Sequence, residues 1–255
     1  MVNVSEKYRI VYKYGSEKLI SIHDGMKPLP GVEYEDGNVF HIDNDAVKVL
    51  HAPIVLPQGK RRMSLEKVCF FMENDAVKRN IHPNGILYAT DTGEYEGYSA
   101  EYKHDACNGI GMYDRYRLIK LPTLIEDYHL HYEDFSYYTN INVRVVDCEL
   151  WNVLFCPDGM YFIDKDPCII GEPVPFEDNI SKLRMIMSSV VPSMVRASTD
   201  NTHAESDRLA AEISTSIYNN LRSPAYKPRD FERDFRGYNT IDEYVQDRGI
   251  KVKIK

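Results

Sequence analysis

The stretch NVRVVDCELWNVLFCPDGMYFIDKDP, residues 142–167, contains apolar runs on both sides of a Pro-Asp-Gly turn. The runs Val153–Phe155 and Met160–Ile163 therefore predict the two strands of an antiparallel hairpin. Such a hairpin would return the chain from Asn152 to a point beside Asp164. Amide and carboxylate oxygens are ligands that magnesium accepts in proteins. The stretch therefore predicts a polar site at the open end of a hairpin.

Upstream of this hairpin the chain has the pattern of a β-rich region with one helix. Apolar residues at helical spacing predict a helix at about 63–79, which a Pro-Asn-Gly turn at Pro83 would end. Short alternating runs separated by turn residues predict three pairs of strands. These pairs cover residues 8–23 around Tyr14-Gly15-Ser16, residues 38–42 with 46–51, and residues 85–90 with 95–102.

The pattern becomes mainly helical beyond a change in composition near residues 103–111. We therefore expect an α+β protein with a β-rich N-terminal lobe over 1–103 and a mainly helical C-terminal lobe over 104–255, the latter carrying the hairpin at about 143–166. The predicted helices of the second lobe cover residues 118–138, as one long or two shorter helices, then 179–190, 204–222 and 240–248.

The composition argues against several classes of protein. A formal net charge of −8 does not favour nucleic-acid binding, and Lys60-Arg61-Arg62 is interpreted as a solvated loop. No stretch approaches the ~20 apolar residues of a membrane span, so we expect a cytoplasmic protein. The cysteines form no pattern typical of a disulfide framework or a zinc site. They are Cys69, Cys107, Cys148, Cys156 and Cys168.

Asp147 and Asn152 have the spacing Asp-x-x-x-x-Asn, and the predicted hairpin and Asp164 follow them. Phosphoryl transfer from a nucleotide needs this set: an Asp at the attacking hydroxyl, and an Asn and an Asp for magnesium. In this order the residues resemble the protein-kinase-like superfamily over about Gly37–Met187. The resemblance implies a two-lobed kinase fold that uses ATP and Mg²⁺. It implies that Asp147 orients the hydroxyl and that Asn152 and Asp164 bind the metal.

The resemblance extends upstream to Asp45-Ala46-Val47-Lys48-Val49, which looks like the strand whose lysine contacts the nucleotide phosphates. Lys48 is then a catalytic candidate, and Glu66 in the following helix is the candidate that holds it, with Glu73 as a second choice. The segment Gly97–Tyr102 matches the connection that contacts adenine through backbone groups. The implied cofactor-binding residues are Lys48, Gly37, Val39, Ala46, Glu101 and Tyr102.

Several positions depart from the family pattern. Val145-Val146 replaces His-Arg before Asp147, so control by activation-loop phosphorylation is not expected. Asp164-Lys165-Asp166 replaces Asp-Phe-Gly, which makes Asp166 an additional metal candidate. The chain has no G-x-G-x-x-G loop, and Gly37 alone lies near the corresponding place. By resemblance, Asp178 would anchor the backbone of the catalytic loop.

The leading interpretation is a divergent Ser/Thr protein kinase-like enzyme, with ATP and a protein or small-molecule hydroxyl acceptor as partners. A small-molecule kinase of the aminoglycoside or choline kinase type is similar in its Asp-x-Asp ending and in its short segment before Asn179. A pseudokinase that serves as a binding module is another alternative, as is an unrelated α+β protein with an accidental match. Trp151 is interpreted as a packing residue, and His104, His129 and His131 as surface or satisfied side chains.

Overall fold

The structure is a computed structural model, and it describes residues 5–23, 26–29, 37–50, 63–108, 116–163, 165 and 167–253. The chain divides into two compact units. The first contains Met1–Ala76, Ile81–Lys103 and Asp164–Pro167, and the second contains Val77–Asn80, His104–Ile163 and Cys168–Lys255. Two short segments, Val77–Asn80 and Asp164–Pro167, therefore belong to a different unit from their neighbours in sequence.

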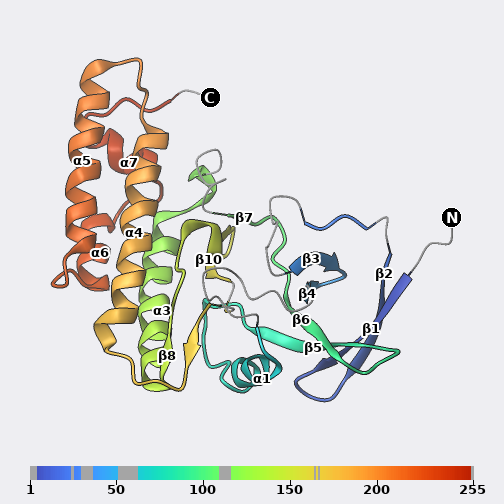
Figure 1. The fold of residues 1–255 in the computed structure, drawn as a ribbon. Helices are drawn as coiled ribbons and strands as arrows, with labels where there is room; N and C mark the ends of the chain where they lie inside the picture. The colour runs from blue at the N-terminus through green and yellow to red at the C-terminus, as the bar shows by residue number, and fades with distance from the viewer. Residues whose placement is uncertain are drawn as a thin grey trace. The chain divides into compact units, whose positions relative to one another are not determined.

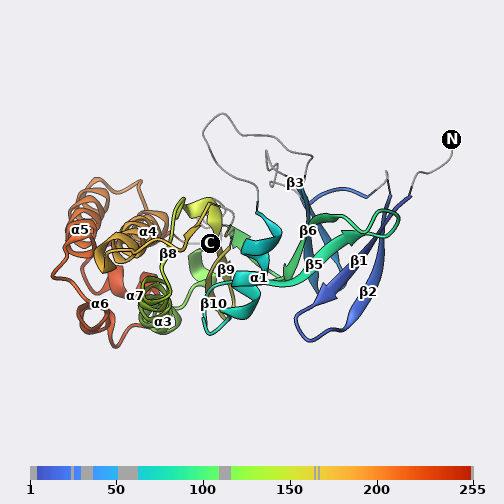
Figure 2. The same ribbon diagram turned by 60° about the horizontal axis from the view of Figure 1, so that its bottom comes forward.

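The first unit contains a six-stranded antiparallel sheet with the order β2-β1-β5-β6-β4-β3 (Figure 1). Each of the three predicted strand pairs is present, and the sheet is curled (Figure 2). The strands are β1 (Ser5–Tyr12), β2 (Glu17–His23), β3 (Gly37–Ile42), β4 (Asp45–Leu50), β5 (Pro83–Ala89) and β6 (Tyr95–Glu101).

Alternation along the strands gives this sheet its core, because successive side chains point to opposite faces. One face buries a hydrophobic cluster, and each large side chain in it contributes about 1.5–3 kcal/mol relative to exposure. The cluster contains Tyr8, Ile10, Ile20, Ile22, Phe40, Val47 and Leu87. The β1–β2 turn places Gly15 at φ 78°, where a residue without a side chain is favoured.

The helix of the first unit, α1 (Leu65–Glu73), is shorter than the predicted 63–79. It begins where the Ser64 side chain accepts a hydrogen bond from the backbone N–H of Lys67 at 3.2 Å. It ends at Asn74, whose side-chain amide donates to the carbonyl of Phe70 at 2.9 Å.

The residues after α1 make contacts that a longer helix would prevent. The backbone N–H groups of Lys78 and Arg79 donate to the Asp134 carboxylate at 2.9 and 2.8 Å, and both belong with Asp134 to the second unit. In a continued helix these N–H groups would bind carbonyls four residues earlier. The predicted end of the helix is therefore wrong, because a distant carboxylate accepts these hydrogen bonds.

The Pro-Asn-Gly sequence at Pro83 also differs from the prediction. It forms the start of β5, where the register with β6 shifts between Pro83 and Gly85. This irregularity accommodates proline and glycine within a strand instead of a turn.

The second unit is mainly helical, and helices α3, α4 and α5 lie side by side in it (Figures 1 and 2). Its helices are α3 (Leu121–Asn140), α4 (Phe176–Ser198), α5 (Ala204–Arg222), α6 (Pro228–Phe235) and α7 (Ile241–Gln246), with single 3₁₀ turns η1 (Tyr116–Leu118) and η2 (Leu150–Asn152). Short strands complete it: β7 (Cys107–Asn108), β8 (Val143–Arg144), β9 (Val153–Cys156), β10 (Gly159–Phe162) and β11 (Ile169–Ile170).

The predicted helix at 118–138 is one long helix, α3. The helix predicted at 179–190 is too short, because α4 continues through Pro192 to Ser198. Proline removes a backbone donor and usually ends a helix, but here it is buried in a helix that packs along α5. Helix α6 was missed because its eight residues, PRDFERDF, are mostly charged and offer few apolar positions. Among the described residues, no helix combines the length and apolar character needed to cross a membrane.

Candidate functional site

The hairpin expected after Asn152 is present in the second unit. Strands β9 and β10 pair antiparallel, with Val153 opposite Phe162. The N–H of Ile163 donates to the carbonyl of Asn152 at 3.0 Å. This hydrogen bond joins the two strands at the end of the hairpin opposite its turn. Asp164 and Asp166, the two candidate metal carboxylates, lie outside the described residues.

The loop 145–152 is held in one conformation by its own hydrogen bonds. The carbonyl of Asp147 accepts from the side-chain amide of Asn152 at 2.8 Å and from the N–H of Glu149 at 3.0 Å. Asp147 has φ 57°, in the left-handed region that non-glycine residues adopt uncommonly. Such backbone strain persists where the surroundings over-determine it, and it is frequent at functional sites. The Asp-x-x-x-x-Asn spacing therefore corresponds to a hydrogen-bonded loop.

A buried asparagine on α4 anchors the start of this loop. The Asn179 side chain accepts from the N–H of Val145 at 2.8 Å and donates to the carbonyl of Val143 at 2.8 Å. Asn179 is fully buried, and it also donates to the Thr139 hydroxyl at 3.1 Å. The expected anchor, Asp178, is exposed and lies 3.9 Å from the Arg144 guanidinium. The anchor is thus one residue later than expected, because residue 179 is the one that α4 turns towards the loop.

Of the three proposed metal ligands, the structure describes only Asn152. The Asn152 side-chain nitrogen donates to Asp147, and its oxygen accepts no hydrogen bond among the described residues. An amide oxygen fixed in this way is a suitable magnesium ligand. Within the described ranges, no group of three or more His, Cys, Asp or Glu side chains could hold a metal ion. The ligand roles of Asn152, Asp164 and Asp166 stay predictions.

In the first unit, Lys48 lies in the middle of β4 and is only 4% exposed. It is opposite Val39 on β3 and Tyr98 on β6, and it shares its face with Ala46, two residues earlier. Val47 points to the other face, into the hydrophobic cluster. Val39, Ala46 and Lys48 are therefore three candidates on one face of the sheet. A buried ammonium needs charged or polar partners.

The candidate partner of Lys48 has a different environment. Glu66 lies in the first turn of α1 and is exposed, as is Glu73 at the other end of the helix. Among the described residues, no ion pair joins Lys48 to either glutamate. The pairing of Lys48 with Glu66 stays a prediction.

The remaining candidates of the first unit make contacts within that unit, and their roles in cofactor binding stay predictions. A Cβ at Gly37 would lie 2.5 Å from the carbonyl oxygen of Val49, so the β3–β4 pairing requires glycine there. Glu101 is exposed and pairs with Lys103 at 2.8 Å. The Tyr102 ring stacks on His41 at 3.7 Å, and its N–H donates to the carbonyl of Asn44 at 3.0 Å. A base that used this N–H would have to displace that bond.

Two buried carboxylates on α3 hold neighbouring segments, Asp127 the hairpin and Asp134 residues 78–80, and neither was singled out from the sequence. Asp127 accepts from the N–H of Met160 at 2.8 Å and forms an ion pair with Arg79 at 2.7 Å. Burial raises the pKa of Asp127 to about 7, although Arg79 acts in the opposite direction. Asp134 accepts from residues 78–80, including the side chain of Asn80 at 2.8 Å.

The sequence feature that could have identified these buried carboxylates is their spacing. Asp127, His131 and Asp134 follow one another at intervals of four and three residues, which places them on one face of a helix. All three are buried, and the Nε2 of His131 lies 2.9 Å from the carbonyl of Met160. This contact engages one ring nitrogen of His131, so its interpretation as a satisfied residue stays a prediction.

Lys165, between Asp164 and Asp166 in sequence, is buried, with 4% of it exposed. In the same unit, His82 is buried and its Nδ1 lies 3.1 Å from the carbonyl of Phe71. Burial, and then the charge of Lys165, lower the pKa of His82 to about 3. His82 is therefore neutral, with Nδ1 as the donor to this carbonyl.

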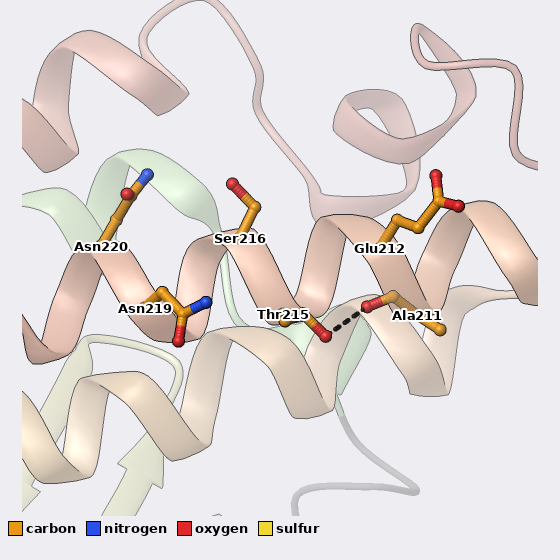
Figure 3. A pocket seen from close by; sticks show the side chains of 6 residues that line it. All are labelled: Ala211, Glu212, Thr215, Ser216, Asn219 and Asn220. Atoms are coloured by element: carbon orange, nitrogen blue, oxygen red, sulfur yellow. Dashed lines mark hydrogen bonds between the residues drawn. The ribbon is translucent and has the colours of Figure 1, made fainter.

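A surface hollow of about 610 Å³ on α5 lies apart from these residues (Figure 3). Within it, the Thr215 hydroxyl donates to the carbonyl of Ala211 at 2.8 Å. The hollow is lined by small side chains, two asparagines and one carboxylate. None of these lining residues is a histidine or lysine that could act as a base for a hydroxyl nucleophile. They are Ala211, Glu212, Thr215, Ser216, Asn219 and Asn220.

No model of a known protein family matches this chain, and no curated protein matches it.

Proposed function

We propose that this chain is an ATP- and magnesium-dependent phosphotransferase with a protein-kinase-like fold, which transfers the γ-phosphate to a hydroxyl. The leading acceptor is a Ser or Thr of a protein. The observation that carries the proposal is the loop 145–152, where the Asn152 side chain holds the carbonyl of Asp147 at 2.8 Å. This bond ties the residue proposed for the hydroxyl to one proposed for the metal.

The roles follow from what phosphoryl transfer requires. Catalysis of this reaction is mostly positioning and stabilisation of charge, so a rigid loop is more useful than a reactive nucleophile. Asp147 would orient the acceptor hydroxyl and take its proton. Asn152 and Asp164 would hold magnesium, which neutralises charge on the phosphates when bound. Lys48 would contact the phosphates from the face of β4 that it shares with Val39 and Ala46.

The geometry of the loop supports these roles energetically. Asp147 keeps a left-handed backbone at φ 57°, which costs about 1–3 kcal/mol for a non-glycine residue. The bonds from Asn152, Glu149 and, further back, Asn179 offset this cost.

A small-molecule acceptor is favoured by the segment that precedes α4. Strand β11 pairs with β8, with Ile169 opposite Arg144, and α4 begins at Phe176. The short, paired segment leaves little chain on which a peptide could dock.

A pseudokinase that serves as a binding module is favoured by the first unit. Glu66, the residue expected to hold Lys48, is exposed. The N–H of Tyr102, expected to contact adenine, donates to the carbonyl of Asn44 instead. An active kinase would need both groups for these functions.

Magnesium-dependent ATP binding, measured by calorimetry, tests the proposal. The wild type should bind ATP with magnesium and lose most of this binding without it. Asp164→Ala should lose the metal-dependent part, whereas Glu172→Ala, which removes an exposed carboxylate, should not. No binding by the wild type would exclude the phosphotransferase and favour the binding module.

A further inference from the structure

The most exposed large apolar side chains of the described residues lie on the hairpin formed by β1 and β2. Tyr14, in the turn, is 89% exposed, and Leu19, in the middle of β2, is 75% exposed. Trp151 follows at 51%, so the expectation that it packs behind the loop is wrong. A single exposed leucine is ordinary on a protein surface, but Leu19 lies on a strand at the edge of a sheet.

Strand β2 has β1 as its only neighbour in the six-stranded sheet (Figures 1 and 2). The N–H of Tyr12 donates to the carbonyl of Ser16 at 2.9 Å, so this pair at the turn is hydrogen-bonded. Hydrogen-bonded and non-hydrogen-bonded pairs alternate along an antiparallel ladder, and the register of β1 with β2 is continuous. Alternate residues of β2 therefore direct their N–H and C=O groups away from β1. They are Glu17, Leu19, Ser21 and His23.

The chain covers the two edges of this sheet differently. At the β3 edge, the N–H of Leu29 donates to the carbonyl of Val39 at 2.9 Å. At the β2 edge, the N–H of Met26 donates to the carbonyl of His23 at 2.8 Å. Within the described ranges, the outward backbone groups in the middle of β2 have no hydrogen bond. Unpaired groups of this kind are a template for pairing with another strand.

The β2 edge also has none of the usual protection against such pairing, which is proline, a β-bulge or a charged side chain over the edge. The strand contains no proline, and its register with β1 is regular. Its one lysine, Lys18, shares the inner face with Ile20, because side chains alternate along a strand. The Lys18 ammonium lies 2.9 Å from Asp43 and 3.4 Å from Asp45, so it is held within its own unit.

The sequence of β2 is complementary to a second copy of itself. If two β2 strands run antiparallel with Ile20 opposite Ile20, the outward backbone groups of the two strands meet. Leu19 is then opposite Ser21 of the second copy in a hydrogen-bonded pair. Glu17 is opposite His23 of the second copy, and its carboxylate can accept a hydrogen bond from the imidazole in either protonation state.

The apolar side chains agree with the same register. On the outer face, the two Leu19 side chains become diagonal neighbours across the axis, a separation that long side chains can span. On the inner face, the two Ile20 side chains lie directly opposite each other. Ile20 belongs to the hydrophobic cluster of the first unit, so this contact would join the clusters of the two copies.

We propose that two copies of this chain associate through β2, so that their six-stranded sheets form one continuous antiparallel sheet across a two-fold axis. The interface is isologous, because both copies contribute the same strand. This inference is independent of the proposed phosphotransferase, since β2 contains none of the residues assigned to that activity.

Sedimentation equilibrium of the full chain over a wide range of concentration tests the association. The wild type should show a reversible dimer. Leu19→Lys places two ammonium groups near the axis and should raise the dimer Kd at least about tenfold. Tyr14→Lys adds the same charge to the turn, outside the paired residues, and is the matched control. Its dimer Kd should stay within about twofold of that of the wild type.

A second variant removes an outward donor. Ser21→Pro lacks the N–H that would pair with Leu19 of the second copy, and proline is tolerated on an edge strand when its missing N–H would face solvent. This variant should be monomeric, whereas Ser21→Thr, which keeps the N–H, should dimerise like the wild type. Circular dichroism shows whether each variant is folded.

Hydrogen exchange locates the contact. In the wild type, the N–H groups of residues 17–23 should exchange more slowly as the protein concentration rises. The turn at residues 91–93 lies in another hairpin of the same sheet and should exchange at a constant rate. Ser21→Pro should abolish the concentration dependence at 17–23.

Charge exchange tests the register. His23→Glu places a carboxylate opposite Glu17 twice in the dimer and should raise the Kd about tenfold. The double variant Glu17→Lys/His23→Glu restores opposite charges and should return the Kd to within about threefold of that of the wild type. Within one copy, Arg9 lies 3.4 Å from Glu17. Arg9→Gln removes only that exposed pair and should leave the Kd unchanged within about twofold.

Four outcomes would overturn the inference. A wild type that is monomeric at every concentration would remove the second copy as the occupant of this edge. A dimer that Leu19→Lys and Ser21→Pro leave intact would place the interface elsewhere. Slow exchange at 17–23 at every concentration would assign the edge to another segment of the same chain. Failure of the double variant to restore the dimer would reject the register with Ile20 opposite Ile20.

Discussion

The loop 145–152 and the face of β4 that carries Lys48 differ in how their candidate residues are held. In the loop, polar side chains fix the backbone: Asn152 binds Asp147, and Asn179 binds residues on the entering strand. On β4, strand register positions Lys48 beside its neighbours, while Glu66 on α1 is exposed. Asp147 and Asn152, two of the residues proposed for the hydroxyl and the metal, are thus held within one unit by side-chain hydrogen bonds, whereas strand pairing sets the position of Lys48 in the other unit.

The largest effect expected from this difference is on turnover. Asp147→Asn removes the carboxylate that would accept the proton, but asparagine tolerates the left-handed backbone of this position. We expect kcat to fall about 1000-fold, with ATP affinity unchanged within twofold. Steady-state kinetics and calorimetry check this prediction. Asp158→Asn, in the turn of the same hairpin, is the control, and a similar loss there would show that the effect comes from folding.

The next effect concerns the anchor of the loop. Asn179→Ala leaves the N–H of Val145 and the carbonyl of Val143 without their buried partner, and each such group costs about 1–3 kcal/mol. We expect the free energy of unfolding to fall by about 3 kcal/mol, measured by denaturant titration.

Asn219→Ala on the exposed face of α5 is the matched control for this anchor, and its effect should lie within about 0.5 kcal/mol. Equal stabilities of the two variants would show that the loop does not depend on Asn179. The contrast between a preorganised loop and a less constrained first unit would then be lost.

The stability of the first unit should depend on pH through His82. Its pKa is about 3 in the folded protein and about 6.5 when unfolded, so between these values the unfolded chain binds more protons. Stability therefore falls as the pH falls from 6.5 towards 3. We expect a loss of about 2 kcal/mol between pH 6.5 and pH 5, at 1.4 kcal/mol per pH unit.

The variant His82→Asn isolates this effect, because its amide retains a donor for the carbonyl of Phe71 and does not titrate. It should lose the acid-dependent part of the unfolding curve, while His104→Asn should retain it. An unchanged pH dependence in His82→Asn would mean that other groups cause the acid sensitivity.

Much of the fold was predictable because its signals are local. Turns with glycine or aspartate at special backbone angles mark the hairpins, and Pro-Asp-Gly marks the one after Asn152. The errors arise where distant groups decide. Asp134 takes the N–H groups that would have extended α1, and packing along α5 carries α4 through Pro192. The helix propensity of a short stretch of sequence gives no information about these distant contacts.

For the candidate site, the hairpin after Asn152 was predictable in the same way. The order of Asp147, Asn152 and the hairpin is a local pattern, and the loop geometry agrees with it. The exposure of Trp151 and the anchor at Asn179 depend on how α4 and the loop pack together, and apolar or polar character alone does not determine this. Glu66 shows the same limit, because helical spacing does not say which side of α1 meets the sheet.

The smallest expected effect is that of Glu66→Ala, which tests whether α1 supplies a partner for Lys48. In this arrangement Glu66 is exposed, so Glu66→Ala should change the free energy of unfolding by less than about 0.5 kcal/mol. If α1 turns so that Glu66 meets Lys48 when ATP and magnesium bind, the same variant should lower kcat about tenfold. Glu73→Ala removes an equally exposed carboxylate from the same helix and should leave kcat unchanged. A loss in Glu66→Ala alone would identify a nucleotide-dependent pair, whereas equal values for both variants would leave Lys48 to act without a glutamate from α1.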